Sequence, residues 1–373
     1  MQYEKGIHMK TERILVINNG STSTKVAIYE NEKQIAKADI EVTPEQVKDF
    51  KFAIDQKDFR TGIIMEFLKR ENLNPAELSA VVARAGALPA MESGAYKINP
   101  LMTDILERFP TMQHANNLSA IIAYDIAASV GIPALIYDGD TMDEFEPEAR
   151  VLGLKGFQRV PTCHALNMKS VARLVAEQLG RPYDSLNLII VHLGGGISLS
   201  AHRRGRIIDD IFDDEGPMSP QRAGRFPTSM MVDICYSGRY TKEELQRLLR
   251  GNGGLMSLIG TQDAREIEKR IEAGDKEAEN AYFAMAYQVA KGVGELATVL
   301  RGEVDRIVFT GGMAHGKMFV EWVKERVGFI APIEVIPGER EMEGLALGAL
   351  RVLKGEENAM EYDSLPANYV PRA

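Results

Sequence analysis

The chain has 373 residues, of which 45% are hydrophobic and 26% are charged, and its formal net charge is −9. This composition is ordinary for a soluble globular protein, and the length predicts two domains. The acidic balance argues against a general nucleic-acid binder, which needs a basic face. No apolar run approaches the roughly 18–20 residues that span a bilayer, and the start has no apolar segment typical of a signal peptide. We therefore expect neither a nucleic-acid partner nor a membrane partner.

The two cysteines, Cys163 and Cys235, show no CxxC spacing. They are typical of reduced thiols in a cytoplasmic protein. Residues 1–9 are treated as an extension outside the fold, and residues 362–373 are predicted to form a loose tail.

Apolar runs in the first half alternate between strand and helix patterns. Helices alternating with buried strands predict a mainly parallel α/β sheet. The predicted strands are 14–18, 23–30, 34–42, a short strand ending at Arg84 and a strand ending at Asp138. The predicted helices lie at 59–73 and at 117–131, the second closed by Gly131.

The pattern starts again at residues 187–210, where an apolar strand, a glycine-rich turn and two further strands follow one another. In this alignment Gly194 matches Gly20 and His192 matches Asn18. Helices are then predicted at 241–250, 263–273, 278–301, near Ala314 and at 343–353, with strands at 305–312 and 331–338. This repetition predicts a duplicated domain with a cleft between the halves, and chance similarity of two hairpins is the alternative.

The stretch "INNGSTSTKVAIYENE" (17–32) contains a glycine and a lysine but does not form a Walker A loop. Thr24 stands where the second glycine belongs, and the residues after Lys25 continue as a strand instead of opening a helix. A tight hairpin can still offer backbone N–H groups at Gly20 and hydroxyl donors at Ser21 and Ser23 to an anion. Taken alone, the stretch fits an ordinary polar turn at least as well.

Two further glycine-rich turns occur after predicted strands, at Gly194–Gly196 and at Gly311–Gly312. Each one alone is common between secondary-structure elements. Three such turns in one chain favour a nucleotide cleft, because glycines allow a phosphate or a ribose to approach the backbone closely.

Several charged residues stand where a ligand would meet a sheet. Arg84 and Asp138 each follow a buried strand, and the carboxyl ends of strands are where open α/β sheets bind ligands. Arg222 lies in a loop rich in proline and glycine, and His164 is a lone histidine for which a structural role is the alternative. No spacing resembles a zinc site, so any metal is expected to be a hard cation that shares oxygens with phosphate.

Segments along the chain resemble butyrate kinase and the short- and branched-chain fatty acid kinases of the acetate kinase family. This family belongs to the sugar kinase, heat-shock chaperone and actin superfamily. The resemblance runs in order from about residue 12 to 357 and is carried by "ILVINNGSTSTKVAIYE", "MDEFEPEAR", "CHALNMKSVAR", "VHLGGGISLSAHRRGRIID", "GPMSPQRAG", "RGNGGLMSLIGTQDARE", "AMAYQVAKGVGELA", "VFTGGMAH" and "LALGALRVLKGEE".

The resemblance implies a duplicated two-domain actin-like (ribonuclease H-like) fold with a nucleotide cleft. It also implies an enzyme that makes an acyl phosphate and ADP from ATP and a short-chain carboxylate, with Mg²⁺, and that forms a homodimer or a higher homo-oligomer. We expect an N-terminal substrate domain at 10–155, joined by the C-terminal helix at about 341–357, and a nucleotide-binding domain at 156–340.

The resemblance also implies roles for individual residues. The expected catalytic residues are Asn18, Arg84, Asp138, His164 and Arg222. The expected nucleotide-binding residues are Gly20, Ser21, Ser23, Lys25, His192, Gly194, Gly195, Gly196, Gly311 and Gly312. The expected Mg²⁺ ligands are Asn18, Asp138 and Glu341, with Glu339 as the alternative to Glu341.

The chain departs from the family pattern at "ARAGALPAMESGAY", "QHANNLS" and "IYDGDTMDE", although Arg84, His114 and Asp138 are retained within them. The residues assigned to phosphoryl transfer therefore match the family pattern, whereas the residues expected around the acyl group differ from it. Butyrate or isobutyrate is the favoured substrate, and acetate or propionate is the first alternative. A nucleotide-binding regulatory protein without turnover is the second.

Overall fold

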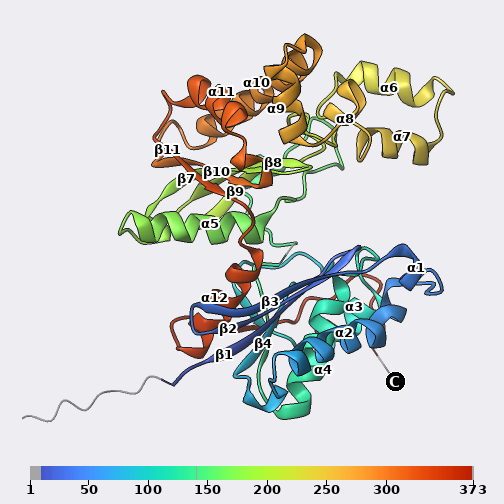
Figure 1. Ribbon diagram of the computed structural model, residues 1–373, viewed down its shortest axis with the longest axis vertical. Coiled ribbons are helices and arrows are strands. Elements are labelled where there is room, and N and C mark those ends of the chain that lie inside the picture. Colours follow the sequence, from blue (N-terminus) through green and yellow to red (C-terminus); the bar gives the residue numbers. More distant parts are fainter. Residues whose placement is uncertain (1–9, 140, 372–373) are drawn as a thin grey trace, which may run out of the picture. The chain divides into compact units, whose positions relative to one another are not determined.

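The computed structural model describes residues 10–139 and 141–371 and divides the chain into two compact units. Unit 1 comprises residues up to Asp143 together with those from Glu341 onward, and unit 2 comprises Glu144–Arg340 (Figure 1). The boundary predicted from the sequence, at 155/156, lies within unit 2. None of the described helices is long and apolar enough to cross a membrane.

Unit 1 contains a seven-stranded sheet in the order β12-β5-β6-β4-β1-β2-β3. Strands β1 to β3 form an antiparallel meander, and β4 and β6 continue the sheet parallel to β1. The strands are β1 (Arg13–Asn19), β2 (Ser23–Glu30), β3 (Lys33–Glu41), β4 (Ala80–Ala83), β5 (Ala95–Lys97), β6 (Ala134–Tyr137) and β12 (Met360–Glu361).

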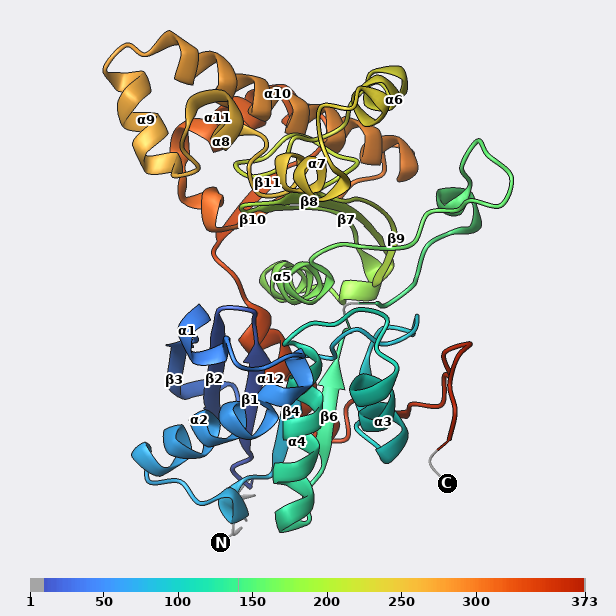
Figure 2. The same ribbon diagram turned by 90° about the vertical axis from the view of Figure 1, so that its right-hand side faces the viewer.

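Helices cover both faces of this sheet. Figure 2 shows α2 and α4 on one face and α12 on the other. The helices of unit 1 are α1 (Pro44–Val47), α2 (Lys57–Arg70), α3 (Pro100–Arg108), α4 (Asn117–Val130) and α12 (Glu341–Leu353), with short 3-10 turns at Ala53–Gln56 and Pro75–Glu77. Leu15 and Ile17 of β1 join the core formed with α2 and α4. Because side chains alternate along a strand, Asn18 faces the α12 side and Asn19 faces the side of α2 and α4.

Unit 2 contains a five-stranded sheet in the order β11-β10-β7-β8-β9. Again the first three strands form an antiparallel meander, and two parallel strands follow. The strands are β7 (Asn187–Leu193), β8 (Ile197–Arg203), β9 (Arg206–Ile211), β10 (Arg306–Gly311) and β11 (Ile333–Pro337).

The sheet of unit 2 also lies between helices. Leu188 and Ile190 of β7 pack with α5, whereas Ile189 and Val191 pack in the core that contains α10 and α11 (Figure 2). The helices are α5 (Ala165–Gln178), α6 (Thr228–Tyr236), α7 (Lys242–Leu249), α8 (Leu255–Ile259), α9 (Ala264–Glu272), α10 (Lys276–Val299) and α11 (Lys317–Val327), with 3-10 turns at Pro147–Arg150, Tyr183–Ser185 and Gly312–His315.

The shared strand order of the two sheets confirms the predicted duplicated α/β fold. The first hairpin closes with a hydrogen bond from Gly20 N to Ser23 O (2.8 Å), and the second with one from Gly194 N to Gly196 O (3.1 Å). The second turn is one residue shorter, because Leu193 pairs with Ile197 whereas Asn19 pairs with Thr24.

Two local predictions are wrong. The helix expected near Ala314 is a 3-10 turn, and α11 begins only at Lys317, after Gly316. The tail is not loose over its described part, because Tyr362 is buried and Tyr369 packs edge-on against Phe109 at 5.4 Å between ring centroids. Aromatic side chains anchor this segment despite its proline-rich appearance. Residues 1–9, 372 and 373, which belong to the predicted extension and the predicted tail, lie outside the described residues.

Candidate active site

The turn between β1 and β2 positions the first predicted phosphate site. Asn18 and Lys25 are direct partners across the antiparallel pair, so their side chains lie on the same face. The Ser21 hydroxyl is 2.9 Å from Nε2 of His114. Because Nδ1 of His114 accepts a hydrogen bond from Asn116 N (3.1 Å), Nε2 carries the proton and donates it to Ser21. His114 had no assigned role.

Three predicted residues of unit 1 meet at the first residue of α12. Nη1 of Arg84, directly after β4, donates to both carboxylate oxygens of Glu341, at 3.0 and 3.2 Å. Nδ2 of Asn18 donates to Oε2 of Glu341 at 2.9 Å. The structure therefore brings Glu341 to Asn18 and Arg84, whereas Glu339 belongs to unit 2.

Asp138 follows β6 in a conformation that few residues adopt. Its φ is +44°, in the left-handed region, and its side chain is almost fully buried. Oδ1 accepts hydrogen bonds from the Ser93 hydroxyl (2.6 Å) and from Gly94 N (3.1 Å). Strained backbone that is held by specific contacts often marks a functional position.

In unit 2, two predicted histidines stack against each other. The rings of His164 and His192 have centroids 4.0 Å apart and planes inclined by 10°. Nδ1 of His164 is 2.8 Å from the Ser198 hydroxyl, and Nδ1 of His192 accepts from Asn167 at 3.0 Å. Burial, together with the neighbouring His164, holds the pKa of His192 well below its usual range. His192 is therefore neutral at pH 7, with its proton on Nε2.

The turn at Gly194–Gly196 is enclosed by the following loop. The Ser219 hydroxyl donates to Gly195 O at 2.6 Å. A side chain on Gly196 would place its Cβ 2.5 Å from Oδ2 of Asp213, so this carboxylate lies directly against the turn. Nε of Arg222 donates to the same oxygen at 2.7 Å.

Asp213 is a site residue that sequence reasoning missed. It is almost fully buried and also accepts from Nη2 of Arg250 at 3.0 Å, so one carboxylate holds two arginines. Its signal in the sequence is an aspartate three positions beyond the predicted end of a strand at Asp210 and before the loop that carries Arg222. A neighbouring Asp–Glu run hid this signal.

Gly311 ends β10 and lies against the end of β7. Its φ is +89°, and a Cβ there would overlap the carbonyl oxygen of Leu193. Gly311 and Gly338 also exchange backbone hydrogen bonds of 2.9 Å in both directions. Only glycine fits this close approach, whereas a Cβ on Gly312 would meet nothing within 4 Å.

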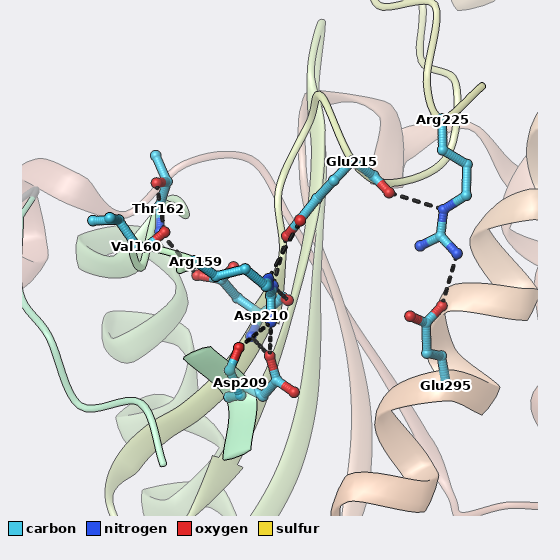
Figure 3. A network of polar contacts seen from close by, with 9 residues as sticks. Arg159, Val160, Thr162, Asp209, Asp210, Glu215, Arg225 and Glu295 are labelled. Carbon is cyan, nitrogen blue, oxygen red and sulfur yellow. Dashed lines mark hydrogen bonds and ion pairs between the residues drawn. The ribbon is translucent and has the colours of Figure 1, made fainter. Parts of the chain in front are cut away.

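An arginine network holds the segment that leads to His164 (Figure 3). Arg159 donates to both carboxylate oxygens of Glu215, at 2.6 and 3.3 Å, and to Asp209 at 2.7 Å. The buried carboxylate of Asp210 accepts from Thr162 N at 3.1 Å. Burial raises the pKa of Asp210 to about 8, outweighing the opposite effect of Arg159.

The residues expected to bind Mg²⁺ provide carboxylate and amide oxygens, which Mg²⁺ prefers. Among residues 10–139 and 141–371, no group of three or more His, Cys, Asp or Glu side chains forms a ready metal site. Mg²⁺ commonly binds through one or two carboxylates together with substrate phosphates and water, so the donor set of Asn18 and Glu341 fits an ion that arrives with a nucleotide. Both described cysteines are free, as predicted.

The structure thus gathers the predicted residues into two groups, each within one unit. Asn18, Arg84 and Glu341 meet in unit 1. His164, His192 and the glycine turn with Arg222 gather in unit 2.

Residues 155–330 match the acetokinase family. This acetokinase segment lies wholly within unit 2 and contains His164, His192, the glycine turn and Arg222.

Solved structures of similar fold cover nearly the whole chain. Acetate kinase from Porphyromonas gingivalis has a TM-score of 0.76 at 20% identity, over 92% of this chain and 100% of that one. A propionate kinase from Francisella tularensis subsp. tularensis SCHU S4 has a TM-score of 0.71 at 18% identity, over 90% and 98%. Acetate kinase from Entamoeba histolytica has a TM-score of 0.70 at 16% identity, over 90% and 98%.

These matches confirm the predicted fold class, because the fold extends over both units. The acetokinase segment and the fold together support a phosphotransferase whose acceptor is a carboxyl group. The predicted resemblance to the acetate kinase family is therefore confirmed for residues 155–330, and the resemblance to butyrate kinase stays a prediction.

Proposed function

We propose that this protein is a kinase of short- or branched-chain fatty acids, which converts ATP and the acid reversibly into an acyl phosphate and ADP. One observation carries the proposal: the acetokinase segment contains an arginine, Arg222, which lies beside a glycine turn and is held there by the buried Asp213. Arg84 is held in a similar way by Glu341 in unit 1. Two fixed guanidinium groups suit a reaction between two anions.

The chemistry explains why arginines matter more than a base. A carboxylate is already ionised at pH 7, so no proton has to be removed from it. It is repelled, however, by the negative phosphoryl group that it must attack. Guanidinium groups bind carboxylate and phosphoryl oxygens through paired N–H donors and neutralise this repulsion. Positioning and charge neutralisation therefore supply most of the catalysis.

We assign the other residues by the same reasoning. The two turns offer phosphate oxygens the N–H groups that do not close the hairpins, since Gly20 N and Gly194 N donate within them. The His164 ring, oriented by Ser198, can donate a hydrogen bond to the transferring phosphoryl group. Asn18, Asp138 and Glu341 would hold Mg²⁺, which draws charge from the leaving phosphate when it is bound with the nucleotide.

The identity of the acid is the finer part of the proposal. We favour butyrate or isobutyrate because the resembling segments run in order along the chain, whereas the departures around Arg84, His114 and Asp138 count against butyrate. Acetate or propionate is the alternative, since the solved structures of similar fold carry those names. One methylene changes specificity by only about 1–3 kcal/mol, so substrates should overlap.

An acid series tests the proposal. The protein is incubated with MgATP, hydroxylamine and one acid at a time: acetate, propionate, butyrate, isobutyrate and longer acids. Trapped hydroxamate with kcat/KM highest for butyrate or isobutyrate supports the proposal. A maximum at acetate or propionate corrects the substrate, and no hydroxamate with any acid refutes the kinase.

A regulatory protein that binds nucleotide without turnover is the second candidate. Retention of Arg84, Asp138, His164 and Arg222 speaks against it. Titration calorimetry distinguishes the two, because a regulator would bind ATP and release no ADP when acid is added.

A further inference from the structure

The β1–β2 turn of unit 1 rests on a buried arginine that the proposed site does not use. Arg60 of α2 has no solvent exposure. Its Nη1 donates to Ser23 O at 3.1 Å and to the Thr24 hydroxyl oxygen at 3.0 Å. Ser23 O is also the acceptor of the Gly20 N–H bond that closes the turn. The guanidinium therefore binds the same carbonyl that shapes the predicted phosphate site.

This buried charge has no counter-ion among the described residues of the chain. The other hydrogen bond of Arg60 goes to the neutral Gln56, whose Oε1 accepts from Nε at 2.9 Å. Nη2 is buried without any partner in the described structure. Burial lowers the pKa of Arg60, although an arginine stays charged. A buried charge without a partner costs free energy in the ligand-free protein.

The same hydrogen-bond network contains a second buried donor without a partner among the described residues. The Thr24 hydroxyl, which accepts from Arg60, donates to Oδ1 of Asn19 at 2.9 Å. Nδ2 of Asn19 is buried and has no partner in the part of the chain that is described. Asn19 N is held by the Ser119 hydroxyl of α4 at 2.9 Å. Arg60, Thr24 and Asn19 thus form a fixed layer of donors under the turn.

We propose that Arg60 is a positioning residue and supplies a fixed positive charge behind the β1–β2 turn, and that the charge it lacks is provided by a phosphoryl group of the nucleotide bound at that turn. This inference rests on the proposed function. Arg60 lies on the face of Asn19, opposite to the face of Asn18 and Lys25, so it acts through the turn and does not contact the substrate.

The physical reason is the weak screening of a buried charge. Charges in the protein interior are screened far less than charges on the surface, so Arg60 favours an anion at the turn without touching it. Its bond to Ser23 O also polarises the peptide group next to the turn. The unpaired charge of Arg60 therefore lowers the stability of the protein without nucleotide. Binding of an anion at the turn should restore this stability.

Three variants test this inference. Arg60→Met removes the charge and keeps a long apolar side chain, and Arg60→Lys keeps the charge without the paired donors. Arg70→Met is the matched control, because Arg70 lies on the same helix with an exposed side chain and a surface contact to Glu71. Thermal unfolding is measured without ligand, with MgATP, with MgADP and with inorganic phosphate, and KM is measured for ATP and for the acid.

Arg60→Met should unfold without ligand at or above the temperature of the wild type, because a buried unpaired charge is gone. It should lose most of the stabilisation by MgATP, and its KM for ATP should rise about tenfold, because the weakly screened charge that favours the bound anion is gone. Its KM for the acid should change little. Arg60→Lys should recover part of the response, and Arg70→Met should behave as the wild type.

A purely structural arginine gives the opposite pattern. Arg60→Met would then unfold at a lower temperature without ligand and would keep the nucleotide response of the wild type, and this result overturns the inference. If Arg60→Met does not fold, Gln56→Glu serves instead, because it places a negative charge where Gln56 Oε1 accepts from Nε of Arg60. Unchanged affinity of Gln56→Glu for MgATP would then refute the inference.

The two proposals fail differently. A wild-type protein that neither responds to nucleotide nor forms acyl phosphate contradicts both the proposed function and this inference. A wild-type protein that does both, together with an Arg60→Met variant of equal nucleotide affinity, contradicts this inference alone.

Discussion

His164 and His192 stack face to face, with ring centroids 4.0 Å apart and an angle of 10° between the ring planes. Two imidazolium ions cannot both be stable at this separation, because like charges repel strongly in a buried site. His192 is the buried member and accepts a hydrogen bond from Asn167, so it is kept neutral.

This pair predicts a loss of stability in acid. Because the pKa of His192 is lowered in the folded protein, the unfolded chain binds a proton more readily below about pH 6.5. Folding stability should fall as the pH drops from about 6.5 towards the lowered pKa. The melting temperature of His192→Gln should fall less between pH 7 and pH 5 than that of the wild type. Parallel melting curves for the two proteins would contradict the neutral state of His192.

Asp210 predicts the opposite slope. Its pKa of about 8 lies above the ordinary value of 3.8, so the folded protein binds a proton that the unfolded chain has lost. The stability that this proton contributes is complete below about pH 4 and disappears as the pH rises towards 8. The melting temperature of the wild type should therefore fall relative to that of Asp210→Asn between pH 5 and pH 8. A difference of about 1 kcal/mol would appear as ~2–4 °C.

The measurement for Asp210 is a melting curve at several pH values for both proteins, in buffers of equal ionic strength. Asp210→Asn keeps an oxygen that can accept from Thr162 N. A constant difference between the two proteins at all pH values would show that Asp210 is ionised throughout and would refute the prediction.

Arg222→Ala should reduce kcat by about two to three orders of magnitude, because a fixed donor to developing charge is removed. ATP should still bind, since Arg222 is assigned to the reacting groups and not to the nucleotide base. Arg225→Ala is the control: Arg225 lies in the same loop but is exposed and contacts Glu215 O and Glu295. Steady-state kinetics and calorimetry measure both properties, and near-normal turnover of Arg222→Ala would refute the role of Arg222.

Gly196→Ala should weaken nucleotide binding, because its Cβ would lie 2.5 Å from Oδ2 of Asp213 and would displace the carboxylate that holds Arg222. Gly294→Ala is the matched control, since a Cβ there meets nothing within 4 Å in the interior of α10. That change should leave binding intact and stabilise the helix by roughly 0.5–1 kcal/mol. Equal ATP affinity of both variants would show that the turn tolerates a side chain.

The sequence predicted elements whose signal is local. Apolar alternation with polar turns located β1, β2 and β3 within two residues of their observed ends, and Gly131 marked the end of α4 through its left-handed conformation. The internal repeat in the sequence also aligned Gly20 with Gly194, and both glycines close an antiparallel hairpin. The helix α5, in contrast, begins directly after His164 without a capping side chain, and it was not predicted.

The contacts within the site could not be predicted in the same way. Arg84 and Glu341 are 257 positions apart, and only folding brings them together. Asp213 and Arg60 looked like ordinary charged residues of a surface run and a surface helix, although both are buried. Helical spacing places Arg60 on the buried face of α2 with Ile64 and Leu68, but its charge is typical of an exposed residue. The contacts of Glu341 with Asn18 and Arg84 also needed the structure, because sequence spacing does not distinguish Glu341 from Glu339.

The most direct test of the account is phosphorus NMR of the wild-type protein with MgATP and butyrate or isobutyrate. The account predicts an acyl phosphate signal that grows with the release of ADP, depends on the acid, and is absent with Arg222→Ala under the same conditions. ATP that binds and persists unchanged with every short-chain acid would contradict the central claim.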